Sequence, residues 1–158
     1  MARNRKGQTA TEYLVILAVV IVIALIVVGV LGGFPGIGSS SKRRSSELYW
    51  GSADIAVTAH SFDAAGAANV LKVRNNLRNT VTITAITVDE TVVVTNDTSL
   101  ASGGSATFSG SNIASHIDCG SSGDSYAYGV SIAYTDADTG ANYTFTGAGT
   151  KLEGTCAA

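Results

Sequence analysis

The arrangement of apolar and polar positions divides the chain into two regions. From Leu14 to Leu31 no side chain is polar, so the apolar residues would lie on every side of a helix. About 20 such residues at 1.5 Å each span the ~30 Å hydrocarbon core of a bilayer, where a single segment must be helical. The pattern predicts one long hydrophobic transmembrane helix over residues 8–38.

The end of this apolar run is rich in residues that break helices. Residues 32–38 hold four glycines and Pro35, and three serines follow them. These residues predict a kink or a melted stretch at 32–38. Residues 39–52 are expected to form a linker or short helix ending at Gly51, with Leu48, Tyr49 and Trp50 leaning on the domain that follows.

From residue 53 onward the pattern changes to the alternation that is typical of strands. About seven or eight short strands separated by turn residues favour an Ig-like sandwich over residues 53–158. The expected fold class is therefore α+β, a long N-terminal hydrophobic helix followed by an all-β sandwich head. The predicted strands lie at 55–59, 70–73, 81–88, 92–94, 106–108, 126–134 and 143–145.

The residues before the apolar run form a short basic leader. A secretory leader carries its cleavage site after its apolar region, whereas the only obvious processing position here, Gly7–Gln8, precedes it. The sequence KGQTATEYL at residues 6–14 resembles the class III signal peptide of archaeal type IV pilin-like proteins, most of all that of adhesion pilins. The resemblance in sequence covers about the first thirty-five residues. Beyond them only the general type of domain is similar, a β domain rich in Gly, Ser and Thr and of about the expected size.

This resemblance implies a structural function. A prepilin peptidase would cut between Gly7 and Gln8, remove the leader 1–7 and leave Gln8 as the first residue of a subunit that polymerises into an extracellular adhesion pilus. Glu12 would then pair with the new α-amine of Gln8 on a neighbouring subunit. From the residues alone, Glu12 could equally reach lipid headgroups or favour its own helix dipole.

The same resemblance implies partners and a location. The partners would be further copies in a helical filament, the peptidase, a platform membrane protein and an assembly ATPase. The precursor would lie in the cytoplasmic membrane with its N-terminus inside. Two other functions stay open: a permanently membrane-anchored surface binding module, and a subunit of the related motility filament, the archaellum.

Charge argues against a nucleic-acid partner. Taking the three leader cations Arg3, Arg5 and Lys6 from a formal net charge of −2 leaves −5. The basic cluster 42–44 and the looser group at 72–78 are not interleaved with stacking aromatics, as a nucleic-acid surface would be.

Cys119 and Cys156 suit an extracellular head with one disulfide, and two free buried thiols are the alternative. Asn96 and Asn142 each begin an Asn-x-Thr acceptor for N-glycosylation, which would place both on the surface of an exported head.

Other combinations of residues carry little chemistry. Asp136 and Asp138 loosely suggest calcium, but a hairpin turn fits their position between two strands better. His116 near Cys119, and His60 elsewhere, lack the ligand spacing of zinc and a demonstrable base–nucleophile pair. We therefore expect no enzymatic activity, no metal and no cofactor.

Overall fold

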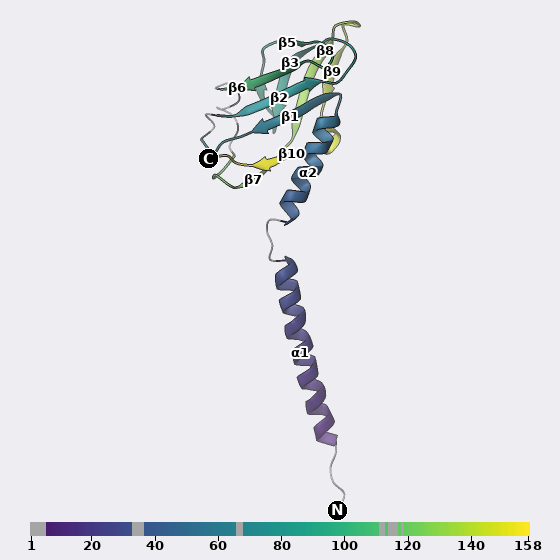
Figure 1. Ribbon diagram of the computed structural model, residues 1–158, viewed down its shortest axis with the longest axis vertical. Coiled ribbons are helices and arrows are strands. Elements are labelled where there is room, and N and C mark those ends of the chain that lie inside the picture. The colour runs from purple at the N-terminus through teal and green to yellow at the C-terminus, as the bar shows by residue number, and fades with distance from the viewer. Residues whose placement is uncertain (1–5, 33–36, 66–67, 111–112, 114–116, 118) are drawn as a thin grey trace, which may run out of the picture. The chain divides into compact units, whose positions relative to one another are not determined.

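The structure is a computed structural model of the full chain (Figure 1). It describes all residues except 1–5, 33–36, 66–67, 111–112, 114–116 and 118, and it describes the backbone but not the side chains of residues 6–10, 28–32 and 37–39. The chain forms two compact units, residues 1–39 and residues 40–158, and each is treated by itself below. The second unit is called the head.

The expected fold class is wrong. The described chain is mostly β, and its helical residues lie in two helices, α1 (Lys6–Gly32) and α2 (Ile37–Ser52), with side chains described over 11–27 and 40–52. No single long helix covers residues 8–38. Glycine is a poor helix former and proline cannot donate the hydrogen bond of a helix interior, so the composition of residues 32–38 disfavours one helix over 8–38. Residues 33–36, the centre of the predicted kink or melted stretch, lie outside the described residues.

The expected transmembrane helix is corrected as well. Among the residues that the structure describes, no helix is both long and apolar enough to cross a membrane. We call residues 11–27 the apolar segment.

The head contains ten strands among its described residues, arranged in three sheets. The three-stranded sheet has the order β1-β2-β6, the two-stranded sheet pairs β10 with β7, and the five-stranded sheet has the order β4-β3-β8-β9 with β5 also on β3. Every ladder is antiparallel. The strands are β1 (Ile55–Ser61), β2 (Val70–Asn75), β3 (Val81–Val88), β4 (Thr91–Val94), β5 (Thr98–Leu100), β6 (Ser105–Ser109), β7 (Ser125–Tyr128), β8 (Val130–Asp136), β9 (Asn142–Phe145) and β10 (Leu152–Thr155); the 3-10 turn η1 (Gly147–Gly149) follows β9.

One hydrophobic core serves all three sheets. The buried positions of β2 alternate with exposed ones, as expected for a strand with one face on a core. Apolar side chains from the three-stranded and five-stranded sheets, which lie one in front of the other in Figure 1, belong to a single cluster. Its fully buried members include Ile55, Leu71, Val73, Val81, Ile83, Ile86, Ile132 and Leu152.

The arrangement differs from the predicted Ig-like sandwich because the third sheet is separate. The alternating run 126–134, predicted as one strand, divides at Gly129 into β7 and β8, which belong to different sheets. Asp89 holds this division, since its Oδ1 accepts a hydrogen bond of 2.6 Å from the Gly129 N–H and its own N–H donates to the Gly129 carbonyl at 2.8 Å. The strands β5 and β10 were not predicted.

Candidate functional site

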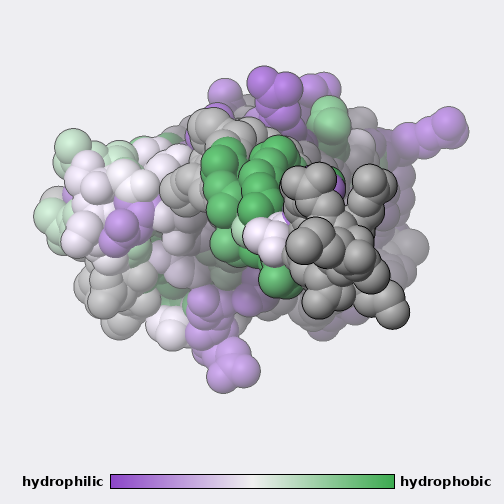
Figure 2. Space-filling view, turned by 90° about the horizontal axis from the view of Figure 1, so that it is seen from below, coloured by the Kyte–Doolittle hydropathy of each residue, from purple (hydrophilic) through white to green (hydrophobic). Residues whose placement is uncertain are grey.

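Two features of the chain concern function, and the first is the surface of the apolar segment. Every side chain described in residues 11–27 is exposed, and thirteen large apolar ones from Tyr13 to Val27 are between 42% and 67% exposed. Figure 2 shows apolar residues as a green surface. Monomeric soluble proteins rarely expose contiguous apolar patches above a few hundred Å².

Glu12 lies at the start of this segment. Its side chain is exposed, and it has no ion-pair partner among the residues that the structure describes. Gly7 and Gln8, the predicted processing site, are in the first turns of α1, and their side chains lie outside the described set. Their assembly and processing roles therefore stay predictions.

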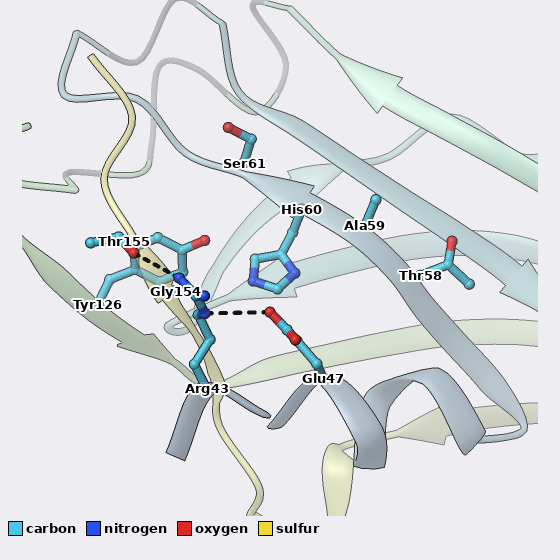
Figure 3. Close-up of a pocket in the computed structure, with 9 residues that line it drawn as sticks. All are labelled: Arg43, Glu47, Thr58, Ala59, His60, Ser61, Tyr126, Gly154 and Thr155. Carbon is cyan, nitrogen blue, oxygen red and sulfur yellow. Dashed lines mark hydrogen bonds and ion pairs between the residues drawn. The ribbon is translucent and has the colours of Figure 1, made fainter. Parts of the chain in front are cut away.

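The second feature is a groove on the head, which we call the α2 groove (Figure 3). It has a volume of about 260 Å³. Helix α2 contributes Arg43 and Glu47, strand β1 contributes residues 58–61, and Tyr126 and residues 154–155 come from β7 and β10. Its walls thus come from elements far apart in the sequence.

Arg43 crosses the groove from α2 to β10. Its Nε lies 3.5 Å from Glu47 Oε1, one helical turn away, and its Nη1 donates a hydrogen bond of 3.3 Å to Thr155 Oγ1. The side chains of the ion pair are 49% and 54% exposed, so water screens it and it adds little stability. The bond to Thr155 joins α2 to the end of β10 at the surface.

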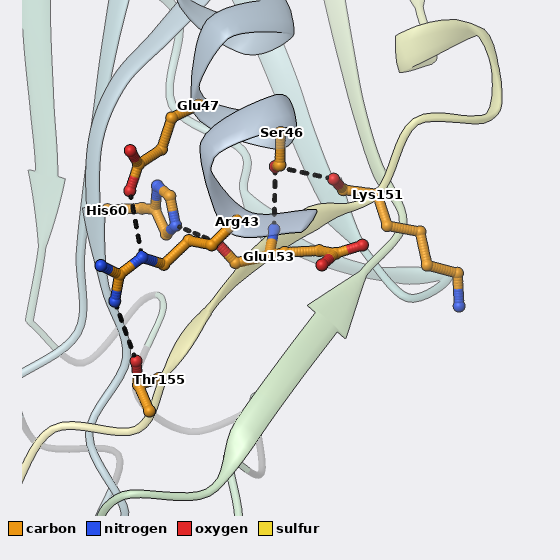
Figure 4. Close-up of polar contacts among 7 residues, drawn as sticks. All are labelled: Arg43, Ser46, Glu47, His60, Lys151, Glu153 and Thr155. Carbon is orange, nitrogen blue, oxygen red and sulfur yellow. Dashed lines mark hydrogen bonds and ion pairs between the residues drawn. The ribbon is translucent and has the colours of Figure 1, made fainter. Parts of the chain in front are cut away.

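Ser46 makes the closest polar contact between α2 and β10 (Figure 4). Its hydroxyl donates a hydrogen bond of 2.9 Å to the Lys151 carbonyl and accepts one of 3.0 Å from the Glu153 N–H. Among the strands of the described residues, β10 pairs only with β7, so the backbone groups on its other edge need partners from outside the sheets. Ser46, which is 2% exposed, supplies two of them.

His60 supplies a third partner for the same edge. Its Nε2 lies 3.2 Å from the Glu153 carbonyl oxygen, and because a carbonyl only accepts, Nε2 carries the proton. Burial lowers the pKa of His60, outweighing the opposite effect of this hydrogen bond. The imidazole is therefore neutral near pH 7 and serves as a hydrogen-bond donor to β10.

Tyr126 lines the groove, and its position explains why β10 has a glycine at residue 154. It is 7% exposed and stacks on Tyr128 with ring centroids 4.9 Å apart. Burial raises the pKa of its phenol well above the ordinary value. A Cβ at Gly154 would overlap the Tyr126 hydroxyl, so β10 can run across this ring only with glycine there.

Trp50 fixes the C-terminal end of α2 in the core. Its side chain is fully buried and meets the Phe145 ring edge-to-face at 5.6 Å. The chain after β9 passes so close that a Cβ at Gly147 would lie 2.6 Å from Trp50 Cζ2, and Gly147 also has a φ of +68° that favours glycine. Leu48, by contrast, is 76% exposed, so the prediction that it packs on the head is wrong.

Trp50 and Tyr49 pack on the core as predicted, and the sequence analysis missed the polar contacts of α2, which lie with Trp50 on one helical stripe. Residues 43, 46, 47 and 50 follow the i, i+3, i+4, i+7 spacing of one helix face. Only Trp50 in this stripe is a large apolar residue, so hydrophobic periodicity gave no signal. The only sequence feature that indicated this face was the position of Ser46 one helical turn before Trp50.

The remaining predicted residues are placed as follows. Cys119 and Cys156 form a disulfide with a Cα–Cα distance of 5.7 Å, which confirms the predicted pairing. Asn96 is exposed in the turn between β4 and β5, and Asn142 is exposed at the start of β9. His116 lies outside the described residues.

Asp136 begins a tight hairpin turn between β8 and β9. Its Oδ1 accepts hydrogen bonds of 2.9 Å from the N–H groups of both Asp138 and Thr139. The bond from Thr139, together with one from Asn79, lowers the pKa of this carboxyl. The hairpin prediction is confirmed, and within the described part of the chain no group of three or more His, Cys, Asp or Glu side chains is placed to hold a metal ion.

Comparison with known proteins adds no relative. No protein-family model matches the chain, and no curated protein matches it at a significant level. The class of protein is therefore argued from the two features above. In the α2 groove Arg43 bonds Thr155 and His60 bonds the Glu153 carbonyl, so these side chains connect elements of the head. The apolar segment is the surface with large exposed apolar side chains.

Proposed function

We propose that the chain is a structural subunit of an extracellular archaeal type IV-like adhesion pilus. A prepilin peptidase removes residues 1–7 by cutting between Gly7 and Gln8, and the subunits assemble through the apolar segment. The protein acts by assembly and needs no catalytic residue and no cofactor. The precursor is held at the cytoplasmic membrane, and the assembled product lies on the cell surface.

The observation that carries this proposal is the exposure of the apolar segment. Its thirteen half-exposed large side chains present on the order of 1,000 Å² of apolar surface, worth about 25 kcal/mol if removed from water at 25 cal/mol per Å². A stable protein–protein interface buries roughly 800 Å² per partner. The segment is therefore large enough to hold a subunit in an assembly by itself.

A second copy of the same segment is the partner that fits best. The apolar side chains lie all around α1, and a helix without a polar face has no side to turn toward water. A filament whose subunits contribute such segments to a central bundle covers each one on several sides.

Glu12 gives the bundle its register. A carboxylate next to an apolar bundle needs a cationic partner, and cleavage creates one, the α-amine of Gln8 on a neighbouring subunit. At ~4 Å and an effective dielectric constant of ~20 such a pair gains about 4 kcal/mol before desolvation is subtracted. This contact fixes how far each subunit is displaced along the filament.

The head suits the outside of such a filament. Its core is closed without the apolar segment, and its disulfide is of the kind that persists in oxidising, extracellular surroundings. Export and assembly would use a platform membrane protein and a cytosolic ATPase in addition to the peptidase.

The proposal is tested on fibres sheared from cells of an archaeal host that expresses the full chain and contains a prepilin peptidase. N-terminal sequencing of the fibre subunit should begin at Gln8. Gly7→Phe should trap the longer precursor and abolish the fibres. Subunits that keep residue 1, or that are recovered only as single particles, would overturn the proposal.

Two matched substitutions localise the assembly surface. Val20→Asp places a charge in the apolar segment, whereas Val92→Asp makes the same change on the head at a similar exposure, 48% against 56%. Val20→Asp should abolish fibres and Val92→Asp should keep them. Glu12→Gln should give a processed subunit that is absent from fibres, and normal fibre yield from it would refute the register role alone.

A further inference from the structure

The two N-glycosylation acceptors differ in their surroundings. Asn96 lies in the turn between β4 and β5, with its side chain exposed and Thr98 half-buried at the start of β5. The Thr98 hydroxyl donates a hydrogen bond of 3.3 Å to the Asn96 carbonyl, so both acceptor residues lie on one turn. The amide of Asn142 is instead engaged across a strand pair, its Oδ1 accepting 2.6 Å from Thr135 Oγ1.

A hollow of about 240 Å³ lies directly beside Asn96. We call it the Asn96 hollow. Asn96 and Thr98 line one side of it and Thr107 and Phe108 of β6 line another, with the buried Val94 also contributing. Small-molecule pockets measure about 300–1,000 Å³, so this hollow suits one sugar ring rather than a whole oligosaccharide.

Phe108 gives the hollow an aromatic surface. Its side chain is half-buried, packs against the hydrophobic core on one side and lines the hollow on the other. The apolar face of a sugar ring packs on such a surface and keeps its hydroxyls toward water, in the way that other amphipathic groups cover apolar surface. Thr107 adds a hydroxyl at the rim.

The hollow also lies where the outer edges of two sheets come together. Strand β6 is the last strand of the three-stranded sheet, and β4 and β5 both lie on the outer side of β3 in the five-stranded sheet. Edge strands present unpaired backbone groups that invite pairing with another chain, and proteins protect them. A bulky group at Asn96 would cover both edges at once.

We propose that Asn96, and not Asn142, carries an N-linked glycan whose first sugar ring occupies the Asn96 hollow against Phe108. Asn96 Nδ2 forms a bond to C1 of a saccharide linked to a lipid phosphate. The C1–O bond to the phosphate breaks, the lipid phosphate leaves with the bonding electrons, and Nδ2 loses one proton. This inference rests on the proposed function in one respect, the export of the head.

Glycopeptide and intact-mass analysis of the full chain, recovered from the surface fraction of an N-glycosylating archaeal host, tests the site. Wild type should carry one glycan at Asn96. Asn96→Gln and Thr98→Ala should lose it, Thr98→Ser should keep it, and Asn142→Gln should leave the mass of the glycan unchanged.

The oxidation state of Cys119 and Cys156 in the same molecules separates two kinds of failure. An oxidised surface chain that is unmodified at Asn96, or modified at Asn142 instead, overturns the glycan inference and leaves the filament proposal intact. A chain that is reduced, unmodified and confined to the cytoplasm overturns both.

The packing of the sugar on Phe108 is tested by a cycle of thermal unfolding. Loss of the glycan by Asn96→Gln should lower the Tm by a few degrees in the wild-type background. In a Phe108→Ala background the same loss should change the Tm by much less, because the ring has no aromatic surface to cover. An equal Tm difference in both backgrounds would overturn the placement of the sugar in the hollow.

Discussion

Replacing Ser46 with alanine tests whether α2 is an integral part of the head. The hydroxyl satisfies the Lys151 carbonyl and the Glu153 N–H on the outer edge of β10, and it is 2% exposed. Removing it leaves two backbone groups without this partner, at a cost of about 1–3 kcal/mol for buried groups. Alanine returns about 0.5 kcal/mol through its higher helix propensity.

The matched control is Ser45→Ala, one residue earlier on α2. Ser45 is exposed, so this variant gains the same helix propensity without losing a buried hydrogen bond. The difference between the two variants should be about 2 kcal/mol, which is a shift of about 1 M in the urea midpoint at an m-value near 2 kcal/mol/M. Ser45→Ala itself should match or slightly exceed wild type.

The assay uses residues 40–158, which form a compact unit, and follows fluorescence of the single tryptophan. Trp50 is fully buried at the end of α2, so its emission reports directly on release of the helix from the head. Equal urea midpoints for Ser46→Ala and Ser45→Ala would refute the reasoning. They would mean that β10 does not depend on α2 for its outer edge.

Three further perturbations act on the head itself. Gly154→Ala should destabilise it by several kcal/mol in urea unfolding, because the new methyl group would overlap the hydroxyl of Tyr126. Since the pKa of His60 is lowered on folding, the unfolded state binds more protons below about pH 6.5; the urea midpoint should therefore fall as pH drops from 7.5 to 5.5, and less so in His60→Gln. Reducing the bond between Cys119 and Cys156, which are 37 residues apart, should lower stability by about 4 kcal/mol, measured as the loss in urea midpoint with and without reductant.

The strands were predictable where alternation and turn residues agree. The run 81–88 changes its alternation phase at Ala85–Ile86, where the pairing with β8 is also irregular, yet it forms the single strand β3 in the middle of its sheet. The run 126–134 alternates without a break in phase, yet Gly129 divides it between two sheets. The residue that exchanges hydrogen bonds with Gly129 at this division, Asp89, is forty residues away in the sequence. The alternation of residues within a run cannot predict a hydrogen-bond partner so distant in the sequence.

Helix α2 shows a different limit. Its sequence is mostly polar, so periodicity did not mark the face that contacts the head. Ser46 is buried because it completes the edge of β10, and β10 is itself too short to predict from alternation. The contact between α2 and β10 becomes visible only in the folded chain. The cysteine pair, by contrast, could be predicted because two cysteines permit one intramolecular disulfide.

Stability of the head and assembly of the filament are separable in this chain. The core includes Trp50 and side chains from all three sheets, whereas every described side chain of the apolar segment is exposed. Sites that share no partners contribute additively to free energy. A change at Ser46 should therefore weaken the head without altering the interface, and Val20→Asp should abolish fibres without changing the urea midpoint of the head. The proposed pilus can thus gain or lose subunits through the apolar segment while each head stays folded.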